Sequence, residues 1–302
     1  MNDKDREEIN KEDKMIVVYD EEGNEKLISA EVWREEVLPV HLKINFDNPD
    51  NLYNLIVISL QDGFYLEILE ATEVLIKIDP DKERSYNARG ILLMSLDDLD
   101  GAEKLLKKYI NEFGATGVIL TNLAKVYDKK NQKLKSIETL WEALEHDPNQ
   151  DSGLMWWAAI HREKAGEKGF YDAMRKAATI KGSWRPQLWL ARELLEKKDL
   201  KKAKKYYSKI LKMAEDSFDA LMQISGDLGN NGYIDEVIEL IYPIYVLEKH
   251  SPEVGFNILQ CFIEKKEYFE GEKLLAKLYD LENPTIKENL IHFSKEFESL
   301  KN

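Results

Sequence analysis

Apolar residues recur along this chain at steps of three and four positions, in pairs of segments separated by short polar turns. In the best example, one apolar stripe runs from Leu120 to Tyr127, a polar turn follows at 128–133, and a second stripe runs from Leu140 to Leu144. This spacing places the apolar side chains on one face of each of two successive helices. The pattern therefore predicts a helix–turn–helix unit.

The unit returns with a fixed period. The positions that end successive copies stand 34 residues apart: Pro80, Gly114, Pro148 and Gly182. A fixed period of about 20 to 50 residues is the signature of a repeat array. One position of the first helix carries small residues that let neighbouring helices approach, namely Gly90, Ala124, Ala158 and Ala191. The sixth copy has Pro243 in its second helix, and proline is expected to bend or shorten that helix.

The N-terminal end departs from the repeat. Residues 1–14 are almost all charged or polar, which predicts a disordered tail. Met15–Tyr19 and Lys26–Ile28 flank an acidic turn and predict a short β-hairpin. Ser29 can then cap a helix that is expected to run to about Leu38, the residue before a proline.

The C-terminal end predicts a capping helix over 285–302. Thr285 and Glu288 have the spacing of a capping box. The helix would carry one apolar stripe and one polar face, as the end of a helical array requires. The expected order is therefore the tail at 1–14, the hairpin and leading helix at 15–46, the repeat array at 47–284, and the capping helix.

The repeat pattern resembles the tetratricopeptide repeat (TPR) family over most of the chain. The segments 121–127, 182–192 and 225–230 look like parts of a bacterial TPR family without an assigned biochemical role. The resemblance implies an all-α, right-handed superhelical solenoid of about seven helix–turn–helix repeats. A short N-terminal β-hairpin and a C-terminal capping helix are expected in addition. In this family the first helices line a concave groove, where an extended peptide or a partner helix binds.

Helix geometry identifies the first-helix residues that the apolar core pattern leaves free. Trp and Arg are enriched in binding hot spots, and cations inside an acidic molecule favour an acidic partner. The candidate protein- or peptide-binding residues are Asn122, Lys125, Trp156, Arg162, Arg185, Trp189 and Arg192. The alternative stays open that both tryptophans pack between repeats and that the charged groups are solvated.

One specific form of TPR binding is not supported. Co-chaperones of this family hold the acidic tails of heat-shock chaperones with a carboxylate clamp. Tyr53 and Val57 stand where the clamp has its first Lys and Asn, and Ala88 stands where it has its second Asn. The clamp is absent from this sequence, so chaperone-tail binding is not expected.

Composition narrows the functions further. The chain has 57 acidic and 43 basic residues and a net charge of −14, which argues against nucleic acid as the main partner. The lysines within 197–205 are interpreted as a solvated face. No apolar run approaches the length of a membrane span, no secretory signal is present, and the single Cys261 suits a reducing compartment. A cytoplasmic location is expected.

Catalysis has no supporting constellation. The five histidines are scattered without metal-ligand spacing, and no nucleophile elbow occurs. The glycine-rich run 225–232 lacks the Lys and Ser/Thr of a phosphate loop and is interpreted as an inter-helix turn, preceded by small residues for close packing. His161 is interpreted as a core residue. Neither a cofactor nor a metal ion is expected.

The sequence thus predicts a non-enzymatic scaffold that binds a protein or peptide in the groove. Apolar contact would come from Trp156 and Trp189, and acidic groups of the partner would pair with Lys125, Arg185 and Arg192. Two alternatives stay open. One is a regulatory peptide receptor that compacts on ligand binding, and the other is a self-associating structural protein, a homo-oligomer that uses the hairpin edge or the outer surface.

Overall fold

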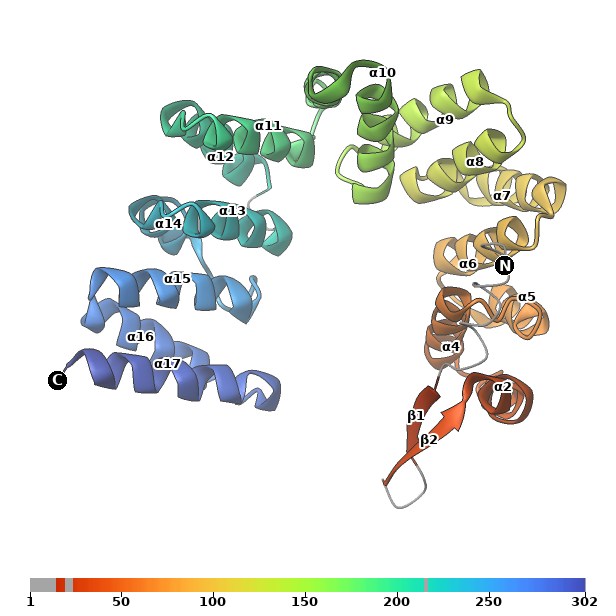
Figure 1. Ribbon diagram of the computed structural model, residues 1–302, viewed down its shortest axis with the longest axis horizontal. Helices are drawn as coiled ribbons and strands as arrows, with labels where there is room; N and C mark the ends of the chain where they lie inside the picture. The colour runs from red at the N-terminus through yellow and green to blue at the C-terminus, as the bar shows by residue number, and fades with distance from the viewer. Residues whose placement is uncertain (1–14, 20–23, 215–216, 302) are drawn as a thin grey trace, which may run out of the picture. The chain divides into compact units, whose positions relative to one another are not determined.

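The computed structural model describes residues 15–19, 24–214 and 217–301, so the predicted disordered tail at 1–14 lies outside the described residues. The described chain is largely helical and divides into two compact units, Met1–His146 and Asp147–Asn302 (Figure 1). No helix among these residues combines the length and the apolar character that crossing a bilayer requires.

Unit 1 begins with the predicted β-hairpin. β1 (Met15–Tyr19) and β2 (Glu25–Ser29) pair in antiparallel orientation. Ile16 packs on the apolar core of the first helices, which supports a hairpin that would be marginal in isolation. Ser29 caps the next helix as predicted, because its hydroxyl accepts a hydrogen bond from the N–H of Val32 at 3.2 Å.

The leading helix runs further than the sequence predicted. α2 (Ala30–Val32), a π-helical turn (Trp33–Val37) and α3 (Leu38–Ile44) follow one another without a break. Pro39 lies in the first turn of α3, directly after the π turn, in which the N–H of Leu38 donates to the carbonyl of Trp33 five residues back. The π turn shifts the backbone bonding there from four residues to five. The prediction that the helix ends near Leu38 was therefore wrong.

Three helix pairs complete unit 1. They are α4 (Pro49–Asp62) with α5 (Leu69–Ile78), α6 (Lys82–Ser95) with α7 (Leu99–Phe113), and α8 (Gly117–Lys129) with α9 (Lys133–His146). Gly90 has its predicted role in the α6–α7 pair, since a Cβ placed on it would lie 2.9 Å from Cδ2 of Leu106. A larger residue there would push the two helices apart.

Glu103 fastens α7 to the turn that follows α8. Its carboxylate accepts hydrogen bonds from Nζ of Lys107 at 2.6 Å and from Nζ of Lys130 at 2.7 Å. These bonds lower the pKa of Glu103 from 4.5 to about 2. The carboxylate is therefore charged at neutral pH and contributes to the stability of unit 1.

Unit 2 continues with helix pairs of the same kind. α10 (Asp151–Ala177) contains both helices of the fourth repeat, which meet at Ala165 and Gly166. Gly166 has φ 60°, a backbone conformation that favours glycine. The remaining α-helices of the unit are α11 (Trp184–Glu196), α12 (Leu200–Met213), α13 (Phe218–Asn230), α14 (Ile234–Leu240), α15 (Pro252–Lys265), α16 (Tyr268–Tyr279) and α17 (Lys287–Leu300).

Proline shortens the second helix of the sixth repeat, as the sequence predicted. α14 ends at Leu240, and a 3-10 turn follows over Tyr242–Ile244 with Pro243 in it. The equivalent helix of the fifth repeat, α12, has 14 residues where α14 has 7. The missing backbone donor of proline accounts for the difference.

α17 covers the C-terminal end of unit 2, as predicted. Phe297 packs closely on Gly271 of α16, where a Cβ would lie 2.3 Å from Cζ of the phenylalanine ring. The predicted capping box was wrong, however. Asn283 is the capping residue: its Oδ1 accepts a hydrogen bond from the N–H of Thr285 at 3.0 Å and starts a 3-10 turn (Pro284–Ile286) ahead of α17.

Candidate functional site

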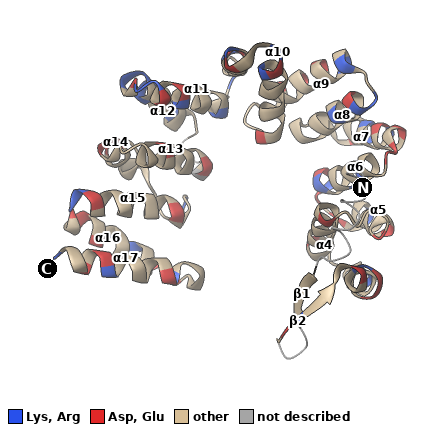
Figure 2. Cartoon of the chain, viewed as in Figure 1, with Lys and Arg blue, Asp and Glu red and all other residues tan. Residues whose placement is uncertain are grey.

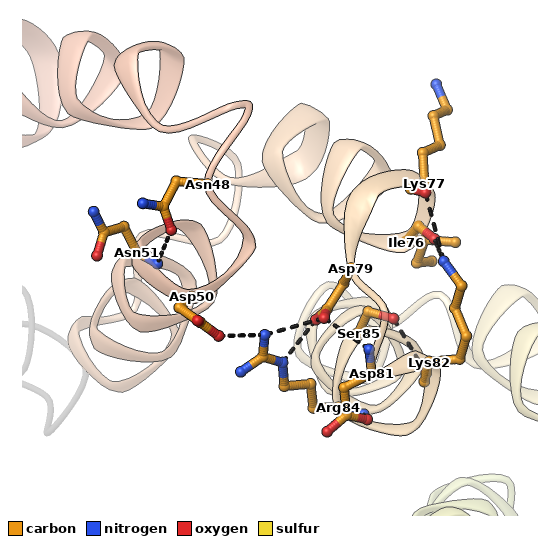
Figure 3. A network of polar contacts seen from close by, with 10 residues as sticks. All are labelled: Asn48, Asp50, Asn51, Ile76, Lys77, Asp79, Asp81, Lys82, Arg84 and Ser85. Atoms are coloured by element: carbon orange, nitrogen blue, oxygen red, sulfur yellow. Dashed lines mark hydrogen bonds and ion pairs between the residues drawn. The ribbon is translucent and has the colours of Figure 1, made fainter.

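Polar side chains about one period apart join the first helices of successive repeats. In unit 1, Arg84 at the start of α6 donates to Asp50 of α4 at 2.6 Å and to the buried Asp79 at 2.7 and 3.0 Å (Figure 3). Hydrogen bonds to the two carboxylates raise the pKa of Arg84. Asn122 of α8 likewise donates to Asn87 of α6. These contacts, called the polar ladder below, connect α4 to α6 and α6 to α8.

In unit 2, two of the candidate binding residues, Arg185 and Arg192, form the polar ladder. Arg185 of α11 donates to Asp219 of α13. Arg192 of α11 donates to both carboxylate oxygens of Asp227 at 2.9 and 2.8 Å, and to the side-chain oxygen of Gln223 at 2.5 Å. Both arginines are therefore already paired with acids of their own chain.

Asp227 is held between Arg192 and Tyr207. The hydroxyl of Tyr207 donates to Oδ2 of Asp227 at 3.4 Å, and only 15% of the Asp227 side chain is exposed. Burial raises the pKa of Asp227, an effect that the hydrogen bonds from Arg192 and Tyr207 oppose. Removal of the arginine would leave a largely buried carboxylate without a cation, which is costly.

The two candidate tryptophans differ in their surroundings. Trp189 of α11 is half-buried, its ring meets the edge of Phe170 at 5.6 Å between centroids, and the guanidinium of Arg192 lies 4.8 Å from its centroid. Arg162 lies over the other aromatic ring of this group, 4.1 Å from the centroid of Phe170. Trp156 of α10 is also half-buried, and it makes no hydrogen bond or ring contact with the residues that the structure describes.

Asn122 and Lys125 lie in α8 of unit 1, apart from the other candidate residues, which belong to unit 2. Asn122 is buried in the polar ladder, and its Oδ1 accepts a hydrogen bond from Nζ of Lys125 at 3.2 Å. Burial lowers the pKa of Lys125. No acidic side chain in the described part of the chain pairs with Lys125. By contrast, Arg162 forms an ion pair with Glu167 at 2.9 Å.

α13 carries two glycines in an environment that the sequence did not predict. The run 225–232 was interpreted as a turn, but residues 225–230 are the last turns of α13. Apart from the two adjoining residues and the backbone of the helix itself, no atom lies within 4 Å of a Cβ placed on Gly226 or Gly229. At Gly255 of α15, a Cβ would lie 2.9 Å from the hydroxyl of Tyr245. The prediction of close packing in this run was therefore wrong.

Gly226 lies between the two α13 residues that contact the neighbouring first helices, α11 and α15. Asp227 reaches α11 through Arg192, and the hydroxyl of Ser225 accepts a hydrogen bond from Asn257 of α15 at 2.8 Å. Successive helix residues are about 100° apart around the axis, so Gly226 faces midway between these two edges. The second glycine, three residues later, is its neighbour on the helix surface. This open part of α13 is called the glycine recess below.

The lysine-rich segment fits the interpretation of a solvated face. It lies on the turn before α12 and on α12 itself, where Figure 2 shows basic residues along the helix. Three of its lysines form ion pairs at 2.6 or 2.7 Å: Lys197 with Glu193, Lys202 with Asp199, and Lys204 with Glu239.

Metal-ligand and acid–base chemistry find little support in the described part of the chain. It contains no group of three or more His, Cys, Asp or Glu residues that could hold a metal ion. The His161 ring lies 4.4 Å from that of Trp157 between centroids, and burial lowers the pKa of His161. A ring in aromatic contact and held neutral fits a packing role.

The chain is similar to proteins of a known family. A family model described as "Tetratricopeptide repeat" matches residues 185–217, which confirms a repeat of the predicted family over these residues. Similar solved structures include a tetratricopeptide repeat protein from Parabacteroides merdae, which is 11% identical, with 83% of this chain and 98% of that chain covered and a TM-score of 0.35. The C-terminal part of a TPR repeat-containing protein from Cytophaga hutchinsonii is 16% identical (82% and 95% covered, TM-score 0.33). The APC/C hetero-tetramer Cut9–Hcn1 is 13% identical (89% and 53% covered, TM-score 0.39).

A curated protein also matches part of the chain. The phenylalanine–tRNA ligase alpha subunit of Synechocystis sp. is 28% identical over 113 residues, which are 37% of this chain and 32% of that protein. The chain thus spans about a third of the length of this relative.

Proposed function

We propose that this tetratricopeptide repeat protein is a non-enzymatic scaffold that binds a segment of a partner protein on the first-helix surface of unit 2. The glycine recess at Gly226 and Gly229 carries the proposal. Glycine inside a helix is less favourable than alanine by about 1 kcal/mol, and no close packing within the described chain requires glycine there. Close approach of a partner to α13 would explain why both positions carry glycine, since glycine has no side chain to block the approach.

The partner segment would bind mainly by apolar contact. Trp189 is linked to the recess through Arg192, which lies over its ring and also donates to Asp227, the neighbour of Gly226. Trp156 has no ring partner among the described residues and could offer a second aromatic surface. Rigid aromatic side chains of this kind are common anchors in interfaces.

An acidic group is better matched by Lys125 of unit 1 than by the arginines of unit 2. Arg185 and Arg192 are paired with Asp219 and Asp227, so an incoming carboxylate would have to displace these acids. Lys125 is desolvated and lacks an acidic partner in the described chain. An opposite charge brought by a partner would stabilise its ionised form. Lys125 is therefore a separate candidate contact for an acidic segment, within unit 1.

A leucine placed in the glycine recess tests the proposal. The full chain, the Gly226→Leu variant and a Lys209→Leu control would each be used to capture proteins from a lysate of the native host, with identification by mass spectrometry. Lys209 is exposed on α12, so the control adds the same side chain elsewhere in unit 2. A partner retained by the wild type and the control but lost with Gly226→Leu supports the recess as the binding site. A partner captured equally by all three would place the site on another surface.

A further inference from the structure

Large apolar side chains are exposed at the N-terminal end of unit 1. Among the described residues, eight of the fifteen exposed large apolar side chains lie within 15–66. They include Met15, Val17 and Leu27 of the hairpin, of which Leu27 is 64% exposed, and Ile44 of α3, which is 69% exposed. Helical arrays need polar caps to prevent association through their ends. This end of the unit presents an apolar surface instead.

β1 also has an edge that no other strand of the described chain covers. The described part of the chain contains one sheet of two strands, so each strand has one edge without a partner strand. β2 carries Glu25 and Lys26, and charged residues discourage the pairing of an edge with other chains. β1 reads Met-Ile-Val-Val-Tyr and contains no charge, proline or glycine. An uncharged edge rich in β-branched residues favours addition of another strand.

The preceding residues of the chain are poorly suited to cover this end. Residues 1–14 contain ten charged side chains, and their large apolar residues are Met1 and Ile9 alone. Two apolar side chains cannot cover the eight exposed ones. Pairing of this segment with β1 would also place charged residues opposite an apolar strand, which gives weak cross-strand contacts.

A second copy of β1 fits the edge better. In an antiparallel pair centred on Val17, this residue faces its own counterpart, Ile16 faces Val18, and Met15 faces Tyr19, so every cross-strand pair is apolar or aromatic. A pair of β2 strands centred on Leu27 would instead place Lys26 opposite Ile28. A two-fold axis makes such a contact self-complementary and closed.

We infer that β1 pairs antiparallel with β1 of a second copy of the chain, so that two hairpins form one four-stranded sheet. The exposed apolar face of each hairpin, with Met15, Val17 and Leu27, then continues across the dimer axis. Three or more strands with an apolar face are far more stable than an isolated hairpin. The surface is separate from the glycine recess, so the inference does not depend on the proposed function.

A charge in the middle of β1 tests the pairing. The full chain should have the mass of a dimer in analytical ultracentrifugation, and Val17→Lys should raise its dimer dissociation constant at least tenfold, because two lysines would meet at the axis. Leu134→Lys is the matched control, since Leu134 of α9 in the same unit is 81% exposed but remote from β1 in sequence. The control should remain a dimer. A wild type that is monomeric at about 100 µM, or a dimer unaffected by Val17→Lys, overturns the inference.

Disulfide formation provides a second test that does not depend on weakening the hairpin. Val17→Cys places two thiols opposite each other at the axis, so mild oxidation should give a cross-linked dimer on a non-reducing gel. Leu134→Cys should give none. The native Cys261 is buried, and burial raises its pKa to about 12, so it should contribute no background. Absence of the cross-link in the folded Val17→Cys variant would contradict the predicted register.

Discussion

Replacement of Gly226 by alanine should stabilise unit 2 and at the same time weaken partner binding. Gly226 lies inside α13, has no positive φ, and has no atom within 4 Å of a Cβ placed on it, apart from the adjoining residues and the backbone of the helix. Alanine in a helix interior is favoured over glycine by about 1 kcal/mol, largely because it restricts the unfolded chain. The unfolding midpoint of unit 2 should therefore rise by about 2–4 °C.

The stability change can be measured by circular dichroism during thermal and urea unfolding of the full chain. Gly255→Ala is the matched control, because it makes the same substitution in another first helix of unit 2. A Cβ at that position would lie 2.9 Å from the hydroxyl of Tyr245 and 3.2 Å from Cδ1 of Leu278. The control should lower the midpoint, since the added methyl group must displace packed neighbours.

Binding should respond in the opposite direction to stability. With a partner purified after lysate capture, titration calorimetry should show a weaker affinity for Gly226→Ala and a further loss for Gly226→Leu, as the glycine recess fills. A lower midpoint for Gly226→Ala would refute the open environment of this residue. A higher midpoint together with unchanged affinity in both variants would refute the recess as the binding site.

Three further substitutions test contacts inside unit 1 or inside unit 2. Glu103→Gln should lower the unfolding free energy by about 1 kcal/mol at pH 7. Urea titrations should show this difference vanish between about pH 4.5 and pH 2, since the folded pKa of Glu103 is about 2 and its ordinary value 4.5, so wild-type stability is lost as pH falls through this window. Arg192→Met should cost about 2 kcal/mol, because it leaves Asp227 largely buried without a cation; an unchanged urea midpoint would contradict this role. Gly271→Ala should cost about 2 kcal/mol by displacing Phe297, and hydrogen exchange should then be faster in α17 than in the wild type.

The sequence predicted those features of the fold that depend on local pattern. The apolar periodicity located the helix pairs, because each helix must bury one stripe. Pro243 shortened its helix as expected, since the loss of a backbone donor acts within one turn. Pro39 did not end its helix, because the π turn directly before it shifts the backbone bonding from four residues to five. Such a turn leaves no clear signal in the local sequence.

The candidate site was harder to predict because glycine in a helix can mark either close packing or an open surface. Gly90 allows close packing against Leu106, whereas Gly226 faces open space. The residue type is the same in both cases, and only the side chains that tertiary packing brings nearby distinguish them. A sequence without its fold therefore favours the commoner interpretation, close packing, and that interpretation was wrong for α13.

The polar ladder could have been predicted from the period, and it changes how Arg192 should be tested. Residues one repeat apart lie side by side in the array. Asp227 follows Arg192 by 35 positions, so the spacing predicts that the two side chains pair. Since Asp227 and Gly226 are adjacent on α13, loss of the arginine would disturb the recess without any direct contact between Arg192 and a partner. Weaker binding by Arg192→Met alone would thus be ambiguous. Gly226→Ala separates the two effects, because it leaves the polar ladder intact and changes only the open surface.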